Sequence, residues 1–136
     1  MCIRDSLKLY QHRSYVLALE QASSLSGMYV DEAEDGMSFR SAQDLLLVGG
    51  GGHRTGRQGG GWDALEQFTR RRYPNAKIHS RWATQDCITL DRLPYIGPYS
   101  SGTQGLYVAT GFNKWGMTSS MVAAGVLADQ IGRAHV

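Results

Sequence analysis

Short apolar segments alternate with Ser, Gly, Asp and Glu through the first third of the chain. Such segments, with β-branched and aromatic residues between turn-forming ones, are typical of antiparallel strands joined by short turns. The pattern predicts a meander of strands, one after another in sequence order. The expected strands are His12–Glu20, Met28–Val30, Met37–Ala42 and Asp44–Val48.

A helix is predicted after these strands. Trp62, Leu65 and Phe68 recur at a spacing of three, which places them on one face of a helix. The run Arg70–Arg72 suits a helix C-terminus, where cations interact favourably with the helix dipole. Pro74 follows and stops the helix. The arginines therefore need no basic binding patch to explain them.

The second half of the chain predicts a strand, a turn, a further strand and a helix. The strands are expected at 77–84 and 106–110, with a Pro- and Gly-punctuated turn at 91–98 between them. From Trp115 on, Met and Ala recur at helical spacing with a small-residue face. A strand, a glycine turn and a helix in this order aim free backbone N–H groups beyond the end of the strand.

A glycine run that follows the 44–48 strand raises the question of a phosphate loop. Gly51 and Gly56 have the Walker A spacing, but Arg57 replaces the lysine and Gln58 the hydroxyl residue. Glutamine cannot bind Mg²⁺ as that hydroxyl does, and no G-x-G-x-x-G can be placed in the run. A small phosphate- or nucleotide-binding module remains one alternative function, and a fragment that is incomplete and inactive on its own remains another. A flexible glycine loop without chemistry is the plain interpretation of the run.

Length and charge narrow the class of protein. The chain has 136 residues, enough for one domain with a modest core, and a formal net charge of +2. It contains no apolar run of the roughly 20 residues that a membrane helix needs. This composition favours neither a nucleic-acid partner nor a membrane partner.

The two ends of the chain resemble translated sequencing adapters. Residues 1–6 match what a transposase-type adapter encodes, and residues 131–136 match a ligation-type adapter. We therefore expect both hexapeptides to be artefacts and residues 7–130 to be a piece of a longer gene. Without Arg4, Asp5 and Arg133 the net charge falls to +1, and Cys87 is the cysteine left. A single cysteine fits a cytoplasmic protein.

Two blocks downstream carry a family resemblance. WATQDCITLDRLPYIG (82–97) is similar to the pattern W-x-G-x-R-P-x-T-P-D-G-x-P-x-I-G, and LYVATGFNKWGMT (106–118) to x-Y-x-A-x-G-H-x-x-x-G-x-T. Both patterns belong to the FAD-dependent D-amino-acid oxidase and glycine oxidase superfamily. The first block matches at Trp82, Thr89, Asp91, Pro94, Ile96 and Gly97. The stretches GFNKWGMTSS, SFRS, GGGGHRTG and RWATQDC resemble most a subgroup of deaminating glycine/D-amino-acid oxidases. Some members of that subgroup carry a C-terminal Rieske domain.

The resemblance implies an α/β fold, as an α+β fragment of the complete flavoprotein. Residues 7–90 would be part of an antiparallel or mixed substrate-domain sheet. Residues 91–130 would be the last strand–helix unit of a Rossmann-like FAD-binding domain. The N-terminal dinucleotide-binding half of the same protein would be missing from this sequence, and a [2Fe-2S] Rieske cluster, where present, would lie in a missing downstream domain.

The implied chemistry is oxidation of a small amine or amino acid to an imine, by hydride transfer to N5 of FAD. In this family the protein mainly positions the substrate and tunes the flavin, so no catalytic side chain is assigned. The turn and helix N-terminus would stabilise negative charge at the flavin N1–O2 end, with Lys114 adding a positive charge. The expected cofactor-binding residues are Gly50, Gly51, Gly111, Phe112, Asn113, Lys114, Trp115, Gly116, Met117 and Thr118.

Three residues are expected to bind substrate: His53, Arg54 and Asp86. Asp86 occupies the position where the family often has a carboxylate-binding arginine, so the resemblance favours an amine that Asp86 faces as an ammonium ion. A solvated or turn-capping aspartate is the alternative, and His53 has the alternative of stabilising its loop. Cys87 is expected to be a small half-buried residue, and no metal site is predicted.

Overall fold

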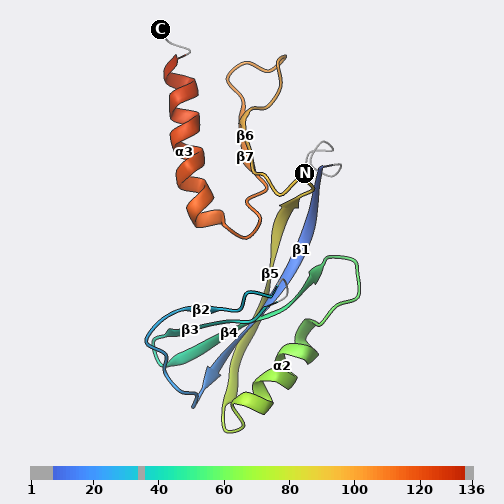
Figure 1. The fold of residues 1–136 in the computed structure, drawn as a ribbon, viewed down its shortest axis with the longest axis vertical. Coiled ribbons are helices and arrows are strands. Elements are labelled where there is room, and N and C mark those ends of the chain that lie inside the picture. The colour runs from blue at the N-terminus through green and yellow to red at the C-terminus, as the bar shows by residue number, and fades with distance from the viewer. Residues whose placement is uncertain (1–7, 34–35, 134–136) are drawn as a thin grey trace. The chain divides into compact units, whose positions relative to one another are not determined.

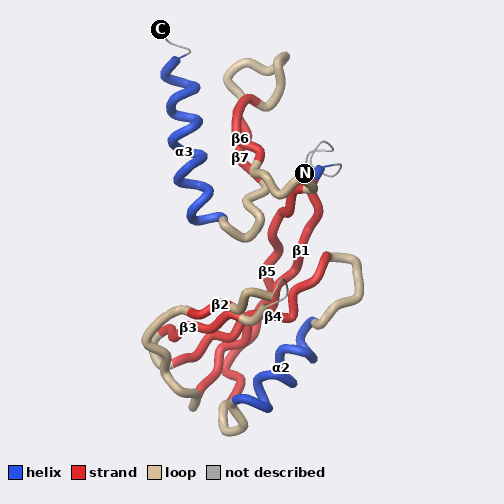
Figure 2. Tube along the Cα trace, viewed as in Figure 1, coloured by secondary structure: helices blue, strands red, loops and turns tan. Residues whose placement is uncertain are grey.

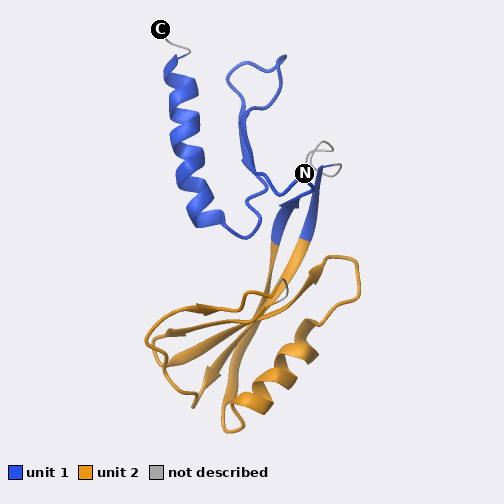
Figure 3. Ribbon diagram, viewed as in Figure 1, with its two compact units in different colours: residues 1–11, 86–136 blue, residues 12–85 orange. Residues whose placement is uncertain are grey.

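The structure is a computed structural model that describes residues 8–33 and 36–133. The chain divides into two compact units (Figure 3). Unit 2 comprises residues 12–85, and unit 1 comprises the residues before it together with those from Asp86 onward. Residues 1–6 and the last three residues, which belong to the adapter-like segments, lie outside the described residues.

Unit 2 is built on an antiparallel sheet with the strand order β2-β3-β4-β1-β5 (Figures 1 and 2). The strands are β1 (Leu9–Glu20), β2 (Tyr29–Val30), β3 (Ser38–Ala42), β4 (Leu45–Arg54) and β5 (Lys77–Thr89). The prediction of a simple meander is wrong for β1, which pairs with β4 instead of β2. Burial agrees with this order, because β1 buries more residues than its neighbour β4, among them Leu17, Ala18 and Leu19, and so takes an interior place.

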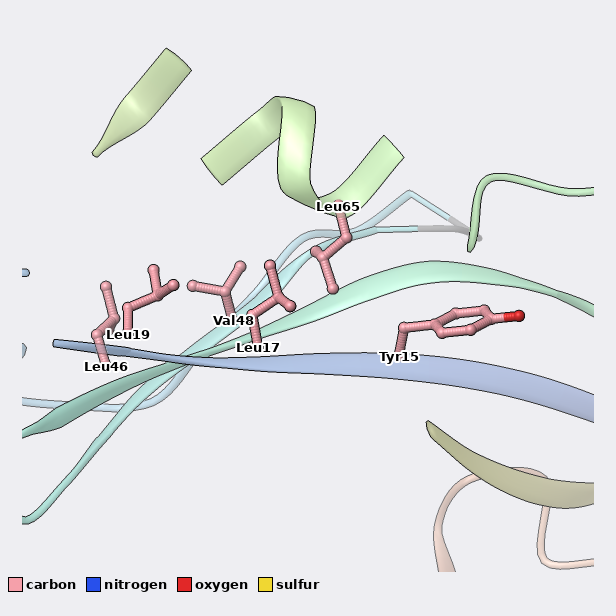
Figure 4. Close-up of a cluster of buried hydrophobic side chains, with 6 residues drawn as sticks. All are labelled: Tyr15, Leu17, Leu19, Leu46, Val48 and Leu65. Atoms are coloured by element: carbon pink, nitrogen blue, oxygen red, sulfur yellow. The ribbon is translucent and has the colours of Figure 1, made fainter. Parts of the chain in front are cut away.

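The core of unit 2 lies between this sheet and helix α2 (Gly61–Arg72). Leucine and valine side chains of β1 and β4 point toward Leu65, which is fully buried (Figure 4). The cluster consists of Tyr15, Leu17, Leu19, Leu46, Val48 and Leu65. The helix occupies the predicted place, with Arg70–Arg72 in its last turn and its C-cap at Tyr73.

Unit 1 contains the hairpin of β6 (Tyr95–Pro98) and β7 (Tyr107–Thr110) and the long helix α3 (Gly116–Arg133). Strand β7 and helix α3 are where the sequence predicts them. The prediction that 91–98 is entirely a turn is wrong, because Tyr95–Pro98 pairs with β7. Pro98 is tolerated there because it is the last residue of a strand in a two-stranded hairpin.

Helix α3 packs against β6 and β7 and leaves much of its surface open. Only Ala123 of the helix is buried, whereas Met117, Met121 and Val122 are exposed. Within residues 8–33 and 36–133, every helix is too short or too polar to cross a membrane.

Candidate functional site

The turn that joins β7 to α3 has an unusual backbone. Gly111, Asn113 and Lys114 have φ angles of 72°, 50° and 71°, in the left-handed region. Residues other than glycine and asparagine rarely adopt this region, because their Cβ atom crowds the following carbonyl oxygen. The predicted order of strand, glycine turn and helix is present, and the turn is sharply bent.

Packing explains the glycine at the start of this turn. A Cβ atom at Gly111 would overlap the Thr89 side chain and lie 3.2 Å from Leu9 Cδ2. Thr89 itself is fully buried at the end of β5. The turn is thus pressed against β5, with the Asn113 N–H donating a hydrogen bond to the Cys87 carbonyl oxygen at 3.4 Å.

The N-terminus of α3 is open in unit 1. Ser119 N–H makes a helical hydrogen bond to Trp115 O at 2.8 Å, whereas the earlier N–H groups of a helix have no partner within it. A Cβ atom at Gly116 would meet no atom within 4 Å. Lys114, Trp115, Met117 and Thr118 are all exposed around this opening. The donors here suit an anionic or electron-rich group.

The glycine run of unit 2 is not the predicted loop. Strand β4 continues through it to Arg54, so Gly49–Gly52 lie in the sheet. The β1–β4 register pairs Tyr15 with Gly50 and then Arg13 with His53, which leaves a bulge at Gly51 and Gly52. Gly51 has a φ of 62°, as such a bulge requires, and a Cβ there would lie 2.6 Å from Gly61 O.

Close neighbours also explain the other glycines of this run. A Cβ atom at Gly49 would lie 2.5 Å from Ser38 Oγ, and one at Gly50 would overlap the Met37 sulfur. Gly51, predicted to approach the cofactor, therefore has a structural reason to be glycine that requires no ligand, whereas a Cβ atom at Gly50 would overlap only the flexible Met37 side chain.

His53 follows the bulge, and both of its ring nitrogens lie within hydrogen-bonding distance of a neighbour. Nδ1 is 3.0 Å from Arg54 O, and Nε2 is 2.9 Å from Tyr15 Oη. Because a carbonyl oxygen only accepts, the neutral ring carries its proton on Nδ1 and accepts the Tyr15 hydroxyl at Nε2. The Tyr15 ring stacks on His53 and meets Trp62 edge-on at 4.8 Å. These contacts fit the loop-shaping alternative for His53.

The sequence alone does not single out Tyr15 as a member of this group. Its position within a strand carried a signal for burial only, and the partner His53 is 38 residues away in sequence. Arg54 is exposed at the end of β4, where its carbonyl oxygen accepts a hydrogen bond from Arg57 N–H at 3.0 Å.

Asp86 lies on β5, half-buried, at the start of the part of that strand that belongs to unit 1. Side chains alternate along a strand, so Asp86 and Thr89 face opposite sides of β5. Cys87 is half-buried, as expected, and accepts a hydrogen bond from Gln11 Nε2 at 3.2 Å.

The structure thus divides the predicted site residues between the units. Unit 1 holds Asp86 and the whole 111–118 turn, whereas unit 2 holds Gly50, Gly51, His53 and Arg54. A cavity of about 440 Å³ in unit 1 reaches Thr110, directly before the turn, and is lined otherwise by Lys8, Leu9, Tyr95, Pro98, Tyr99 and Val108. Within the described ranges, no cluster of three or more His, Cys, Asp or Glu side chains could hold a metal ion.

Comparison with known families decides the class of protein. The family model "DAO: FAD dependent oxidoreductase" matches residues 2–130. The chain belongs to this family. The resemblance inferred from the 82–97 and 106–118 blocks is therefore confirmed.

Relatives of this FAD-dependent oxidoreductase chain agree with the assignment. The chain is 38% identical over 133 residues to a Bacillus subtilis (strain 168) protein, YhfW, which is named as a candidate Rieske 2Fe-2S iron-sulfur protein. The match covers 91% of this chain but 26% of that protein, so the chain spans about a quarter of its relative. That name is consistent with the Rieske-bearing subgroup expected from the sequence.

Solved structures confirm the fold. Glycine oxidase from Geobacillus kaustophilus superposes with a TM-score of 0.73 at 22% identity, covering 93% of this chain and 36% of that one. Glycine oxidase from Bacillus cereus ATCC 14579 and iminodiacetate oxidase from Chelativorans sp. BNC1 each give 0.66 at 17% identity, covering 89% of this chain and 35% of theirs. The mixed α/β fold with antiparallel sheets is that of a glycine oxidase fragment.

Proposed function

We propose that this chain is the C-terminal part of the flavoprotein unit of an enzyme that oxidises an amine or amino acid. The observation that carries the proposal is the β7–turn–α3 connection of a chain in the FAD-dependent oxidoreductase family. Its bent backbone leaves the N-terminus of α3 open, and Gly116 has free space before it.

The donor set of this connection fits FAD. When bound, the flavin would accept a hydride at N5 from the substrate C–H bond, giving an imine. The chain would supply backbone N–H groups at Gly116, Met117 and Thr118 to hold the electron-rich N1–O2 end of the ring. These donors and the positive end of α3 favour the negative charge of the reduced state. The exposed Lys114 ammonium would add to the same field.

For the substrate we propose a separate contribution from each unit: Asp86 in unit 1, and His53 with Arg54 in unit 2. Half-buried Asp86 offers a carboxylate to a substrate ammonium ion. His53 is held by Tyr15 and shapes the end of β4, from which the exposed Arg54 extends. Two structural relatives are named oxidases of glycine and of iminodiacetate, which supports an amine or amino-acid substrate.

We also infer the domain arrangement of the complete protein. Residues 7–90 would contribute to its substrate domain and residues 91–130 to its FAD-binding domain, with the dinucleotide-binding half encoded before this segment. The name of the Bacillus subtilis relative supports a Rieske domain in the same protein, downstream of residue 130.

Flavin binding tests the proposal in two preparations. The complete protein is expected to purify with stoichiometric FAD, and anaerobic addition of an amine or amino acid should bleach the flavin absorbance. The 136-residue chain alone is expected to bind FAD weakly, since it has no dinucleotide fingerprint. A complete protein that binds no FAD would overturn the proposal. Thermal stabilisation of the chain by ATP with Mg²⁺ would support the phosphate-binding alternative instead.

A further inference from the structure

The direction of α3 is set by a turn with two consecutive residues in the left-handed region. Asn113 and Lys114 have φ angles of 50° and 71°, and the following Trp115 N–H donates to Phe112 O at 2.7 Å. Asparagine tolerates this region better than other residues apart from glycine, but lysine does not. The backbone here is strained, so other contacts must hold it in place.

The Asn113 side chain supplies such contacts from both ends of its amide. Its Oδ1 accepts hydrogen bonds from the Thr89 N–H at 2.9 Å and from the Thr89 hydroxyl at 3.2 Å. Its Nδ2 donates to the Arg92 carbonyl oxygen at 3.0 Å. One side chain thus joins the buried end of β5, the turn after it and the turn before α3.

Thr89 makes this anchor rigid. It is fully buried, and its methyl group packs against Gly111 at the other end of the same turn. Arg92 is also in the left-handed region, with a φ of 64°, so the Asn113 amide bonds to a second strained turn. The family pattern leaves position 113 unspecified, and the resemblance counts Asn113 only as one member of the cofactor-binding turn, without this anchoring role.

We propose that Asn113 is a positioning residue that holds the N-terminus of α3 in the orientation needed to stabilise the reduced flavin. This inference rests on the proposed function. Asn113 acts through the backbone donors of Gly116–Thr118 and through the direction of the helix, while its own side-chain amide bonds to Thr89 and Arg92. Loss of the anchor releases the turn and weakens the field at the flavin.

The anchor is tested first in the 136-residue chain without flavin. Asn113→Gly keeps the backbone conformation accessible and removes all three side-chain hydrogen bonds. Amide hydrogen exchange measured by NMR should show the protection of Thr89 N–H falling by about fivefold, the size expected for one net hydrogen bond. Gln43→Gly is the matched control, because Gln43 has a similar φ of 55° in the β3–β4 turn of unit 2. It should leave Thr89 protection unchanged.

The consequence for the cofactor is tested in the complete flavoprotein. Asn113→Gly should shift the two-electron reduction equilibrium of FAD about tenfold toward the oxidised form, which is a potential about 30 mV more negative. Thr89→Val, which removes one hydroxyl donor but keeps the shape, should give a smaller shift in the same direction. Because both changes act through one anchor, Thr89→Val should add nothing in the Asn113→Gly background.

The outcomes separate the two proposals. If wild-type complete protein binds no FAD, the proposed function fails whatever the exchange data show. If it binds FAD and Asn113→Gly lowers Thr89 protection without moving the potential, Asn113 is only structural and the positioning role is overturned. Unchanged Thr89 protection would overturn the anchor itself.

Discussion

The glycines of strand β4 and those of the turn before α3 have different surroundings. In β4, an added Cβ at Gly49, Gly50, Gly51 or Gly52 would meet Ser38, Met37, Gly61 or His12 at 2.8 Å or less. In the turn before α3, Gly111 is packed in the same way against Thr89. Gly116, five residues later, has nothing within 4 Å.

This difference changes where ligand contact is expected. A glycine whose place is filled by its own chain needs no cofactor to explain it, and within β4 this holds most firmly for Gly51, which meets the backbone of Gly61. Gly116 instead faces open space at a helix N-terminus, so a ligand can approach the backbone N–H donors there. The less conspicuous glycine is therefore the better candidate for cofactor contact.

The largest loss of stability is expected where packing and backbone conformation both require glycine. Gly51→Ala should destabilise unit 2 by about 2 to 5 kcal/mol, from left-handed strain and the overlap with Gly61 O. Urea denaturation of the chain would measure this loss. Gly56→Ala is the control, because Gly56 has a φ of 82° but free space, and it should cost about 1 to 2 kcal/mol. Equal losses would mean that the contact with Gly61 contributes nothing.

Gly116, which faces open space, should affect FAD binding and not the stability of the fold. Gly116→Ala should leave the stability of the chain unchanged or slightly higher, but raise the Kd of FAD in the complete protein about tenfold, or about 1.4 kcal/mol. Gly125→Ala provides the control, since Gly125 lies in the same helix, also with nothing within 4 Å. Isothermal titration of the flavin-free proteins gives both constants. Equal FAD affinity in the two variants would remove Gly116 from the site.

The sequence predicted the elements better than their partners. Apolar spacing located α2, α3 and β7 because each buries one face or lies beside a clear turn signal. It ended the predicted strand before Gly49, because local propensity treats glycine as a breaker. In the structure Gly49 pairs with both β1 and β3, and Gly50 pairs with β1. Pro98, which also disfavours strands, led residues 91–98 to be predicted as a turn, although Tyr95–Pro98 forms β6. Family blocks indicated the 111–118 turn, but the roles of Thr89 and Tyr15 depend on contacts between residues far apart in sequence.

A smaller effect is expected at the end of β4, where His53 is held by Tyr15. Tyr15→Phe should destabilise unit 2 by about 1 kcal/mol, because it removes one hydrogen bond and leaves Nε2 of His53 without its donor. Tyr29→Phe is a suitable control, as Tyr29 is half exposed in β2. Nitrogen-15 NMR of the wild-type chain should find the Nδ1–H tautomer, and an Nε2–H tautomer would contradict the assigned direction of the bond.

The smallest expected effect is on the pKa of Tyr95, at the start of β6. Desolvation of its phenol, together with the Asp91 carboxylate, raises the pKa of Tyr95 above its ordinary value of 10.0. Its hydroxyl donates to Asp91 at 3.4 Å, so the folded chain favours the protonated form. The stability that protonated Tyr95 contributes is fully present below its ordinary pKa and is lost as pH rises through its pKa in the folded chain.

Tyrosinate absorbance should therefore show Tyr95 mostly protonated at pH 10.0, with Tyr95→Phe identifying its signal. Asp91→Asn keeps an acceptor for Leu93 N–H while removing the charge, so it should lower the pKa of Tyr95. If the pKa stays unchanged in Asp91→Asn, desolvation alone is responsible.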